Sequence, residues 1–320
     1  MKIVNQKLSV IAAAIAMTSS AAHAEINLGK GLSVSGFIDM SFAYTDVDGA
    51  TSTDRVFAVD QVETTFSYAG SDGISAQVDI EYGESSADSN TDDTFVEQAI
   101  IKKQINDQFS VKAGRFLSYS GWETEEPTGL FQYSGTGYAP VFYGFYQQGI
   151  SAYYDAGMVD IALSVVNDVF ANPIENDTTQ LGTELMLAIT PMEGVTAKAF
   201  FMQEGDKDAI NFWTSYSVDA FTFALEYNTA EDTAFVGSEA DGYLLMANYA
   251  VGDYGLTLRY HDFEIENAAG TTVTEASAFT IAPSMTLGEN LLLVAEYRMD
   301  SDDLTNIDAD TFALEALFTF

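Results

Sequence analysis

The last ten residues, TFALEALFTF (residues 311–320), decide the fold class of this chain. Apolar side chains occupy every second position, namely Phe312, Leu314, Ala316, Phe318 and Phe320. The positions between them are mostly small or polar, so the chain ends on an amphipathic strand. In a soluble protein such a strand would be an edge that invites aggregation unless it is covered. In a membrane β-barrel it is the strand that closes the barrel.

The same alternation recurs along the chain. Between residues 32 and 44 the even positions read Leu, Val, Gly, Ile, Met, Phe and Tyr, and the odd positions are mostly small or polar. Residues 74–82 set an apolar face against Ser75, Gln77, Asp79 and Glu81, a face too polar for a protein core. Residues 181–189 and 221–227 alternate in the same way. We therefore predict an all-β protein whose strands have one apolar face and one face in water.

The N-terminus has the features of a cleaved signal peptide. Lys2 and Lys7 flank a polar start, residues 8–17 (LSVIAAAIAM) are apolar, and residues 22–24 (AHA) have the small-x-small pattern of a cleavage site. We predict a signal peptide over residues 1–24 and one mature domain over residues 25–320. A buried N-terminal helix is the alternative. With the signal peptide, the protein is expected to be exported.

Composition excludes several classes of protein. A formal net charge of −36 argues against binding to nucleic acid, whose phosphates require basic patches. Cysteine is absent, so disulfides and thiolate metal sites are excluded. Beyond the signal peptide no run of 18 apolar residues occurs, which argues against membrane-spanning helices. With 47% hydrophobic and 13% aromatic residues the chain is too apolar to be disordered.

Turn and loop signals divide the mature chain into sixteen predicted strands, with fourteen as the alternative count. Short links are expected near residues 69–73, 105–108, 155–157, 190–194, 218–220, 251–254 and 286–290. Longer polar links are expected near residues 46–55, 83–93, 117–145, 167–178, 203–208, 229–241, 262–272 and 300–309. Short and long links alternate, which is typical of a transmembrane antiparallel β-barrel with short periplasmic turns and long acidic external loops. A soluble β-sandwich is the alternative fold. Residues 95–105 and 273–285 alternate poorly, so we expect shifts or bulges there.

Aromatic residues fall near both ends of the predicted strands. Those near the outer ends are Tyr44, Tyr82, Tyr227, Tyr260 and Tyr297, and those near the periplasmic ends are Tyr68, Tyr154, Tyr249, Phe318 and Phe320. Two rows of this kind are typical of the interfacial girdles of outer-membrane barrels. The terminal Phe320, with another aromatic residue two positions earlier, also resembles the signal that the outer-membrane assembly machinery reads. We therefore expect the outer membrane of a Gram-negative bacterium, with contacts to its lipid and lipopolysaccharide.

Four short motifs resemble those of a known family. They are VKAGRF (residues 111–116), GWE (121–123), FQYS (131–134) and EYRMDS (296–301). The chain is similar in these motifs, and over most of its mature length, to the OmpL-like β-barrel porin family of Gram-negative bacteria. The resemblance implies an outer-membrane channel for small hydrophilic solutes, without a cofactor. It departs from the family pattern at Gln132, where an asparagine is common. A homotrimer, the habit of general porins with this strand number, is a further expectation that no sequence feature fixes.

The longest link, residues 117–145, is by this count the third external loop. It is rich in aromatic residues and glycine and exceeds the length beyond which loops are usually functional or disordered. In general porins the third loop folds into the barrel and narrows it. Here it would bring Glu123, Glu125 and Glu126 to the pore. A lid lying over the mouth is the alternative.

Charges on the inward phase of the strands give the expected pore lining. Lys112, Arg259 and Arg298 fall on that phase, and Arg115 lies at an apparent shift in phase. Because a charged side chain facing lipid would be costly, we expect all four to project into the lumen. Asp79 and Glu81 join them. Either the cations set up a transverse field opposite the loop acids, or they pair with the wall acids Asp79, Glu81, Glu226, Glu296 and Glu315. In both cases inward acids outnumber inward bases, which predicts a preference for cations.

Other function classes have weaker support. Catalysis of lipid hydrolysis would need a nucleophile, a base and an orienting group, but His261 is the one histidine of the mature chain and no GxSxG occurs. The acidic stretch DSNTDD (residues 88–93) lacks the glycine and glutamate of a calcium-binding EF-hand loop. We expect no metal site there, although divalent bridging between external loops or to lipopolysaccharide stays open. The expected function is passive diffusion of small hydrophilic solutes; the alternative is an adhesin, a receptor or a structural barrel.

Overall fold

The computed structural model describes residues 25–50, 52–84, 92–123, 126–170 and 180–320. The predicted signal peptide, Glu125 and most of the acidic stretch 88–93 lie outside the described residues. Seventeen strands occur in the described part. They are β1 (Ile26–Gly29), β2 (Leu32–Val47), β3 (Asp54–Ala69), β4 (Ile74–Glu84), β5 (Asp92–Gln104), β6 (Phe109–Leu117), β7 (Tyr146–Asp155), β8 (Val159–Val166), β9 (Gly182–Met192), β10 (Val195–Glu204), β11 (Lys207–Val218), β12 (Phe221–Glu231), β13 (Glu239–Val251), β14 (Tyr254–Glu266), β15 (Thr272–Leu287), β16 (Leu291–Asp302) and β17 (Ile307–Thr319).

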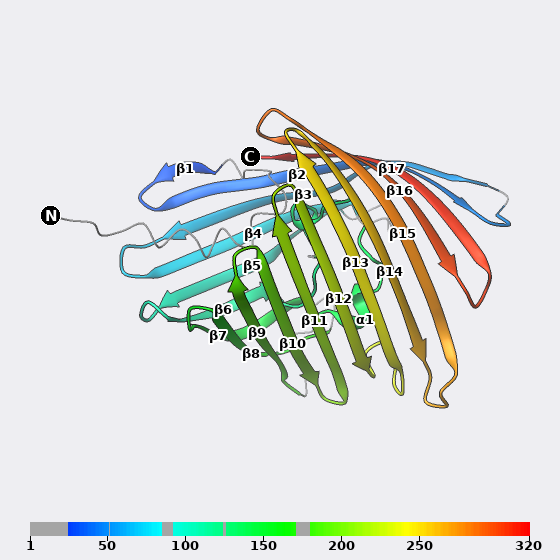
Figure 1. Cartoon of the computed structure of the whole chain (residues 1–320). Helices are drawn as coiled ribbons and strands as arrows, with labels where there is room; N and C mark the ends of the chain where they lie inside the picture. Colours follow the sequence, from blue (N-terminus) through cyan, green and yellow to red (C-terminus); the bar gives the residue numbers. More distant parts are fainter. Residues whose placement is uncertain (1–24, 51, 85–91, 124–125, 171–179) are drawn as a thin grey trace.

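Strands β2 to β17 form one closed antiparallel barrel of sixteen strands (Figure 1). Each pairs with its neighbour in chain order, and β17 pairs back onto β2 from Thr319↔Phe37 to Ala309↔Val47. The short strand β1 pairs with the beginning of β2, just beyond the end of β17. Phe320 exchanges backbone hydrogen bonds of 2.8 and 2.9 Å with Gly36. The predicted count of sixteen is confirmed, and the soluble sandwich and the fourteen-strand alternative are wrong.

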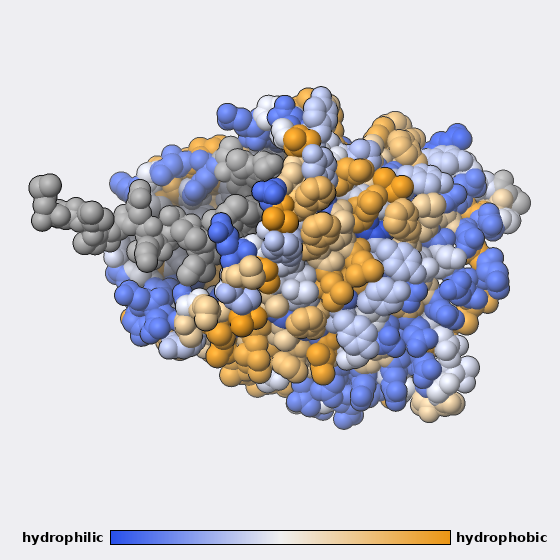
Figure 2. Space-filling model, in the orientation of Figure 1, coloured by the Kyte–Doolittle hydropathy of each residue, from blue (hydrophilic) through white to orange (hydrophobic). Residues whose placement is uncertain are grey.

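Side chains alternate between the outside and the inside of the barrel. In β12, Phe221, Phe223, Leu225 and Tyr227 are exposed, whereas the residues between them are buried. Figure 2 shows apolar residues gathered across the middle of the visible exterior, with hydrophilic residues at the edge where the links β12–β13 and β14–β15 lie in Figure 1. An apolar belt of this extent marks a surface that water does not cover. It is the surface that a bilayer would contact.

Several long polar links are shorter than the sequence indicates. The link expected at residues 203–208 is a two-residue turn, because Gln203 pairs with Asp208 and Glu204 with Lys207 in the β10–β11 ladder. Gly205 has φ +64, a conformation that favours glycine in tight hairpin turns. In the same way β16 and β17 extend to Asp302 and Ile307 within the expected link 300–309. These strands are longer than predicted, because the parts of strands beyond the apolar belt have water on both faces and are therefore polar on both.

The predicted irregularities are confirmed as β-bulges. Glu97 is the extra residue in β5 between the pairs Asp79↔Gln98 and Ile80↔Val96. Val273 is the extra residue at the start of β15, next to the register shift at Glu266. A third bulge, not predicted, leaves Asp60 unpaired in β3 between Asp39↔Gln61 and Met40↔Val59. Bulges re-aim side chains, and those at residues 60 and 97 each carry a carboxylate.

Helix is almost absent from the described residues. A 3₁₀ helix, η1 (Pro127–Gly129), and one turn of α-helix, α1 (Ala139–Phe142), both belong to the link between β6 and β7. Among the described residues no helix has the length and apolar character needed to cross a membrane.

A charged residue on the outer face of the barrel should destabilise the folded protein more strongly at the middle of the apolar belt than at its edge. Leu245 is an outward residue at the middle of β13, and Val251 is an outward residue at its end. Leu245→Arg should lower the free energy of unfolding in lipid vesicles by about 2–4 kcal/mol, and Val251→Arg by about 0–1 kcal/mol. Denaturant titration of the protein refolded into vesicles measures both values. Equal costs at the two positions would contradict the assignment of the apolar belt to the bilayer.

Candidate functional site

The link between β6 and β7, residues 118–145, lies inside the barrel. We call it the infolded link. Its polar groups contact Glu226 at the middle of β12 and Arg259 at the middle of β14, both on the inner face. Tyr138 and Phe142 are fully buried, and Figure 1 shows α1 enclosed behind β12–β14. Because these contacts lie at mid-height of the strands, the infolded link is not a lid over the mouth.

Three wall carboxylates accept hydrogen bonds from backbone N–H groups of the infolded link. The pairs are Glu184 in β9 with Tyr119 (2.8 Å), Glu226 with Trp122 (2.9 Å) and Glu296 in β16 with Ser134 (3.0 Å). A segment without regular structure leaves its backbone N–H groups without partners unless side chains or water supply them. Hydrogen bonds to an ionised acceptor are stronger than neutral ones. The wall acids therefore hold the path of the infolded link.

Glu226 has the most partners of these acids. Its side chain is completely buried and accepts hydrogen bonds from the hydroxyls of Tyr138 (2.8 Å) and Tyr143 as well as from the Asn211 amide. Two of these donors come from the infolded link and one from β11. One carboxylate therefore connects the barrel wall to both arms of the infolded link.

Two wall arginines bind the middle of the infolded link. Arg259 makes an ion pair of 2.7 Å with Glu123 and donates to the carbonyl and hydroxyl oxygens of Ser134. Arg298 donates to the Gly135 carbonyl and pairs with Asp300 two residues away at 2.6 Å. In the described residues neither arginine forms an ion pair with the wall acids. Their positive charge is instead matched by the infolded link and by a near neighbour.

Gln132, where the sequence departs from the family pattern, completes this contact. It is 3% exposed and donates hydrogen bonds to Glu123 (2.9 Å) and to the Ser134 carbonyl (3.2 Å). Glu123 also accepts from the backbone of Thr136 at 2.7 Å. The longer amide side chain therefore fits here, because its partner Glu123 belongs to the same segment.

Lys112 lies on the inner face of β6, as the sequence indicates. Its Nζ lies 4.1 Å from the ring centre of Phe116 and 4.2 Å from that of Tyr119. Both distances are within the range of cation–π interactions. Lys112 therefore supports the first residues of the infolded link.

Arg115 does not face the lumen, and this expectation is wrong. It pairs with Ala99 on one side and Gln148 on the other, in register, on the face opposite Phe116, which is buried inside. No shift in phase occurs in β6. The residues that precede Arg115 are alanine and glycine, whose side chains carry too little polarity to show which face they occupy.

The part of the inner wall formed by β2–β5 and β17 is acidic. Its carboxylates are Asp39, Asp60, Glu63, Asp79, Glu81, Glu97 and Glu315. The infolded link approaches them through Tyr133, whose hydroxyl lies 3.1 Å from Ser41, and through Glu126, which accepts from Gln61 at 3.1 Å. Asp79, one of the predicted residues, accepts from Gln77 and Gln98 at 2.7 Å each. We call this set the acidic wall.

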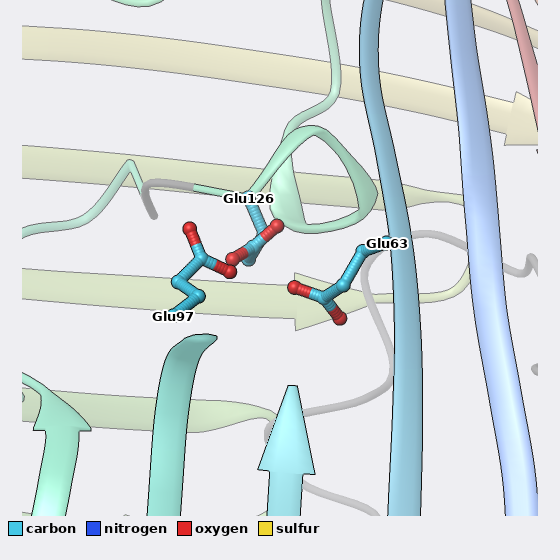
Figure 3. Close-up of side chains that lie close together, drawn as sticks. All are labelled: Glu63, Glu97 and Glu126. Carbon is cyan, nitrogen blue, oxygen red and sulfur yellow. The ribbon is translucent and has the colours of Figure 1, made fainter. Parts of the chain in front are cut away.

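Three glutamates of this region converge (Figure 3). One oxygen each of Glu63, Glu97 and Glu126 lies within 4.8 Å of the others. Glu126 also accepts a hydrogen bond of 2.6 Å from Tyr146. Burial, and then the negative charge of Glu63, raise the pKa of Glu126 to about 8. The sequence indicated only Glu126 of the three; the irregular alternation near Glu97 was the signal available for a second.

A cavity of about 420 Å³ lies at the short-turn end of the barrel, where β1–β6 meet. Its polar lining residues are Glu25, Asn27, Ser33, Ser67, Ser75, Gln77, Lys102 and Lys112. Lys102 pairs with Lys112 across β5 and β6. Sequence reasoning missed Lys102, which alternates onto the inner face only because of the bulge at Glu97. Lys102 and Lys112 therefore form a basic zone between the short-turn end of the barrel and the acidic wall.

His261 lies on the inner face of β14, 2% exposed, with its ring 5.6 Å from that of Tyr138 and nearly perpendicular to it. Its described neighbours include the Tyr138 ring and the Arg259 side chain. A lipid-cleaving site would face the bilayer, whereas this histidine packs against the infolded link.

Removing the Glu226 carboxylate should release the infolded link. Glu226→Ala removes the acceptor of two buried tyrosine hydroxyls and of the Trp122 N–H, and one of the two acceptors of the Asn211 amide. Each unpartnered group costs about 1–3 kcal/mol. Because the infolded link is rich in aromatic residues, chymotrypsin should cleave it in the folded variant, as seen by mass spectrometry of the fragments. Glu231→Ala, at the exposed end of the same strand, is the control and should stay resistant. Equal resistance of the two variants would show that Glu226 does not hold the infolded link.

Comparisons with known proteins agree with this geometry. Solved structures with the same fold include OmpF of Salmonella typhi in complex with daunomycin (14% identity, TM-score 0.71, 92% of this chain and 100% of that one). The anion-selective porin from Comamonas acidovorans is similar at 14% identity and TM-score 0.70, over 90% of this chain and 99% of that one. In-vitro folded OmpT of Vibrio cholerae, in its trimer form, is similar at 13% identity and TM-score 0.66, over 91% and 100%. At these identities the likeness shows the fold alone.

Sequence comparison supplies the family. No curated protein sequence matches the chain. The family model described as Gram-negative porin matches residues 12–305, which is most of the sequence. The chain belongs to the Gram-negative porin family.

Proposed function

We propose that this outer-membrane channel passes small hydrophilic solutes and ions by passive diffusion, that the infolded link constricts it, and that it prefers cations. The observation that carries the proposal is the unequal use of charge around the lumen. On the β9–β16 side, Glu184, Glu226 and Glu296 accept hydrogen bonds from the infolded link. On the other side the acidic wall forms no ion pair with a described lysine or arginine.

The physical consequence is a negative potential at the narrow part of the lumen. The cations nearest to it, Arg259 and Arg298, are matched by Glu123, by Asp300 and by loop carbonyls. Low-dielectric walls focus the field of the remaining carboxylates and raise the local concentration of counter-ions. Rings of acidic side chains favour cations in channels for this reason.

The same geometry gives less support to the alternatives. An adhesin or receptor would present its longest loop outside, whereas here the infolded link lies within the barrel. A lipid hydrolase would need its machinery on the bilayer face, whereas His261 is buried inside. The resemblance to the OmpL-like group, within the Gram-negative porins, remains a proposal that rests on the four short motifs.

Reversal potential in a planar bilayer tests the selectivity. Under a potassium chloride gradient, the channel should reverse on the cation side. The double variant Asp39→Asn, Glu315→Gln should move the reversal potential toward zero, because the acidic wall loses the negative charge that this pair of neighbouring carboxylates carries. Glu289→Gln, in the exposed turn between β15 and β16, should leave it unchanged. Reversal on the anion side would mean that Lys102, Lys112 and the two arginines dominate the constriction.

Deletion of residues 121–139 in the same assay tests the constriction. The shortened channel should show a larger single-channel conductance, since the segment that crosses the lumen is removed. Unchanged conductance would show that the infolded link does not set the width. Absence of current from demonstrably folded wild-type protein would overturn the channel proposal in favour of a structural or adhesive barrel.

We also propose that the channel assembles as a homotrimer. Arg115 lies on the outer face of the barrel beside Gln148, which is two residues from Ile150, an apolar residue exposed on the same face. An arginine exposed to lipid at the bilayer midplane costs about 2–4 kcal/mol. A second copy of the chain packed over this position would remove the arginine from lipid and offer it polar partners. The trimer form of the OmpT structure, which shares the fold, supports the same assembly.

Charge reversal at this position should break the assembly. Arg115→Glu is expected to convert trimers to monomers in detergent, as measured by light scattering on a sizing column. Lys207→Glu, a reversal at the β10–β11 turn, several strands away from β6, is the matched control and should remain trimeric. A wild-type protein that is monomeric, or an Arg115→Glu variant that stays trimeric, would contradict the proposal.

A further inference from the structure

We propose that Glu63, Glu97 and Glu126 bind a calcium ion inside the barrel, and that this ion ties the infolded link to β3 and β5. Figure 3 shows the three side chains reaching toward one another from the two strands and from the segment that precedes η1. The proposal goes beyond passage of solutes, because it concerns a resident ion and the position of the infolded link.

The separation of the oxygens lies within the reach of one calcium ion. The three candidate ligand atoms lie within 4.8 Å of one another. Calcium–oxygen bonds of about 2.3–2.6 Å place opposite ligands up to about 5 Å apart, whereas magnesium bonds of about 2.0–2.1 Å allow only about 4 Å. Calcium can therefore bridge three oxygens with this spread without movement of the backbone. Magnesium demands near-ideal octahedral geometry and gives up its waters reluctantly, so a cluster of three protein carboxylates suits it less well.

Unpartnered oxygens provide the second observation. Glu97 is 3% exposed and Glu63 is 7% exposed, and the Oε2 atom of each is buried without a hydrogen-bond partner. Buried carboxylates without a partner are costly, because burial removes the water that would stabilise their charge. No described lysine or arginine forms an ion pair with Glu63 or Glu97. A bound cation would satisfy both unpartnered atoms and offset the repulsion between the carboxylates.

Local structure directs these side chains to one place. Glu97 is the bulged residue of β5, and the bulge allows it to face inward next to Gln98, which also points inward to Asp79. Glu126 is held by hydrogen bonds from Gln61 and Tyr146, so its carboxylate is oriented before an ion arrives. Orientation of ligands by such outer partners typically changes metal affinity by about 10–100-fold.

The remaining coordination positions are available to water and to Glu81. Calcium takes six to eight oxygen ligands and accepts both one- and two-oxygen binding by carboxylates. Glu81 is the electrostatic neighbour of Glu97 and Glu126 and lies on the same inner face. A site with three or four carboxylates and several waters is within the ordinary range for calcium.

Calorimetry on the folded, chelator-treated protein in detergent tests the proposal. The wild type should bind one calcium ion per chain more tightly than magnesium. Glu97→Gln, which keeps the shape of the side chain, should weaken calcium binding by about tenfold or more, and Glu126→Gln should do the same. Glu289→Gln, at an exposed turn, is the control for non-specific binding to an acidic protein and should match the wild type.

Thermal unfolding gives an independent readout that does not depend on any current through the channel. Addition of a chelator should lower the unfolding temperature of the wild type and of Glu289→Gln but leave that of Glu97→Gln unchanged. Equal calcium affinities of Glu97→Gln and Glu289→Gln would overturn the proposal, because binding would then be diffuse. A wild type whose unfolding temperature ignores both calcium and chelator would overturn it as well, and would indicate carboxylates that share protons instead.

Discussion

The closure of the backbone hydrogen-bond ladder is the constraint on which this structure depends. Inside a bilayer no water is available to satisfy an exposed strand edge, so a membrane sheet must pair its last strand with its first. Here β17 pairs with β2 over almost its full length, and Phe320 and Gly36 complete the ladder. The C-terminal strand, which would be an exposed edge in a soluble protein, is paired on both edges, with β16 and with β2, and Phe312 and Phe318 lie on its outer face. The phase that this closure sets, together with the bulges at Asp60 and Glu97, decides which side chains face the lumen.

The same constraint applies inside the barrel, but there it is met by side chains. The infolded link has almost no regular structure, and its N–H groups and carbonyls must find partners at the centre of the molecule. Carboxylates of Glu184, Glu226 and Glu296 accept from its N–H groups, while Arg259 and Arg298 donate to its carbonyls. Arg259 and Arg298, which the sequence predicts as pore-lining residues, therefore hold the infolded link in place on the β9–β16 side. What remains for a passing solute is the acidic wall opposite.

The sequence predicted the features that depend on period-two alternation. The sixteen strands, their inward faces and the alternation of tight turns with longer links follow from local patterns that each strand carries by itself. Features that depend on neighbours were not accessible. Arg115 follows Ala113 and Gly114, which mark no face, so its phase could only be set by β5 and β7. The convergence of Glu63 and Glu97 with Glu126 depends on the path of the infolded link, which has no periodicity. The polar segment near residue 205 was read as a loop because strands outside the apolar belt lose their hydrophobic face.

One side of the lumen binds the infolded link and the other is the acidic wall. The proposed cation preference and the proposed calcium site both depend on the acidic wall and have one physical cause. Closely spaced buried carboxylates cannot all stay ionised without cations, so such a wall takes up either protons or metal ions. Where three carboxylates converge on one point, as at Glu97, a divalent ion can satisfy them together and stay. Where they are spread around the wall, as from Glu315 in β17 to Asp79 in β4, no single ion reaches them all, and monovalent ions can exchange quickly. The spacing of the acids, rather than their number, would then separate the part of the wall that holds the constriction from the part that selects the ions passing through it.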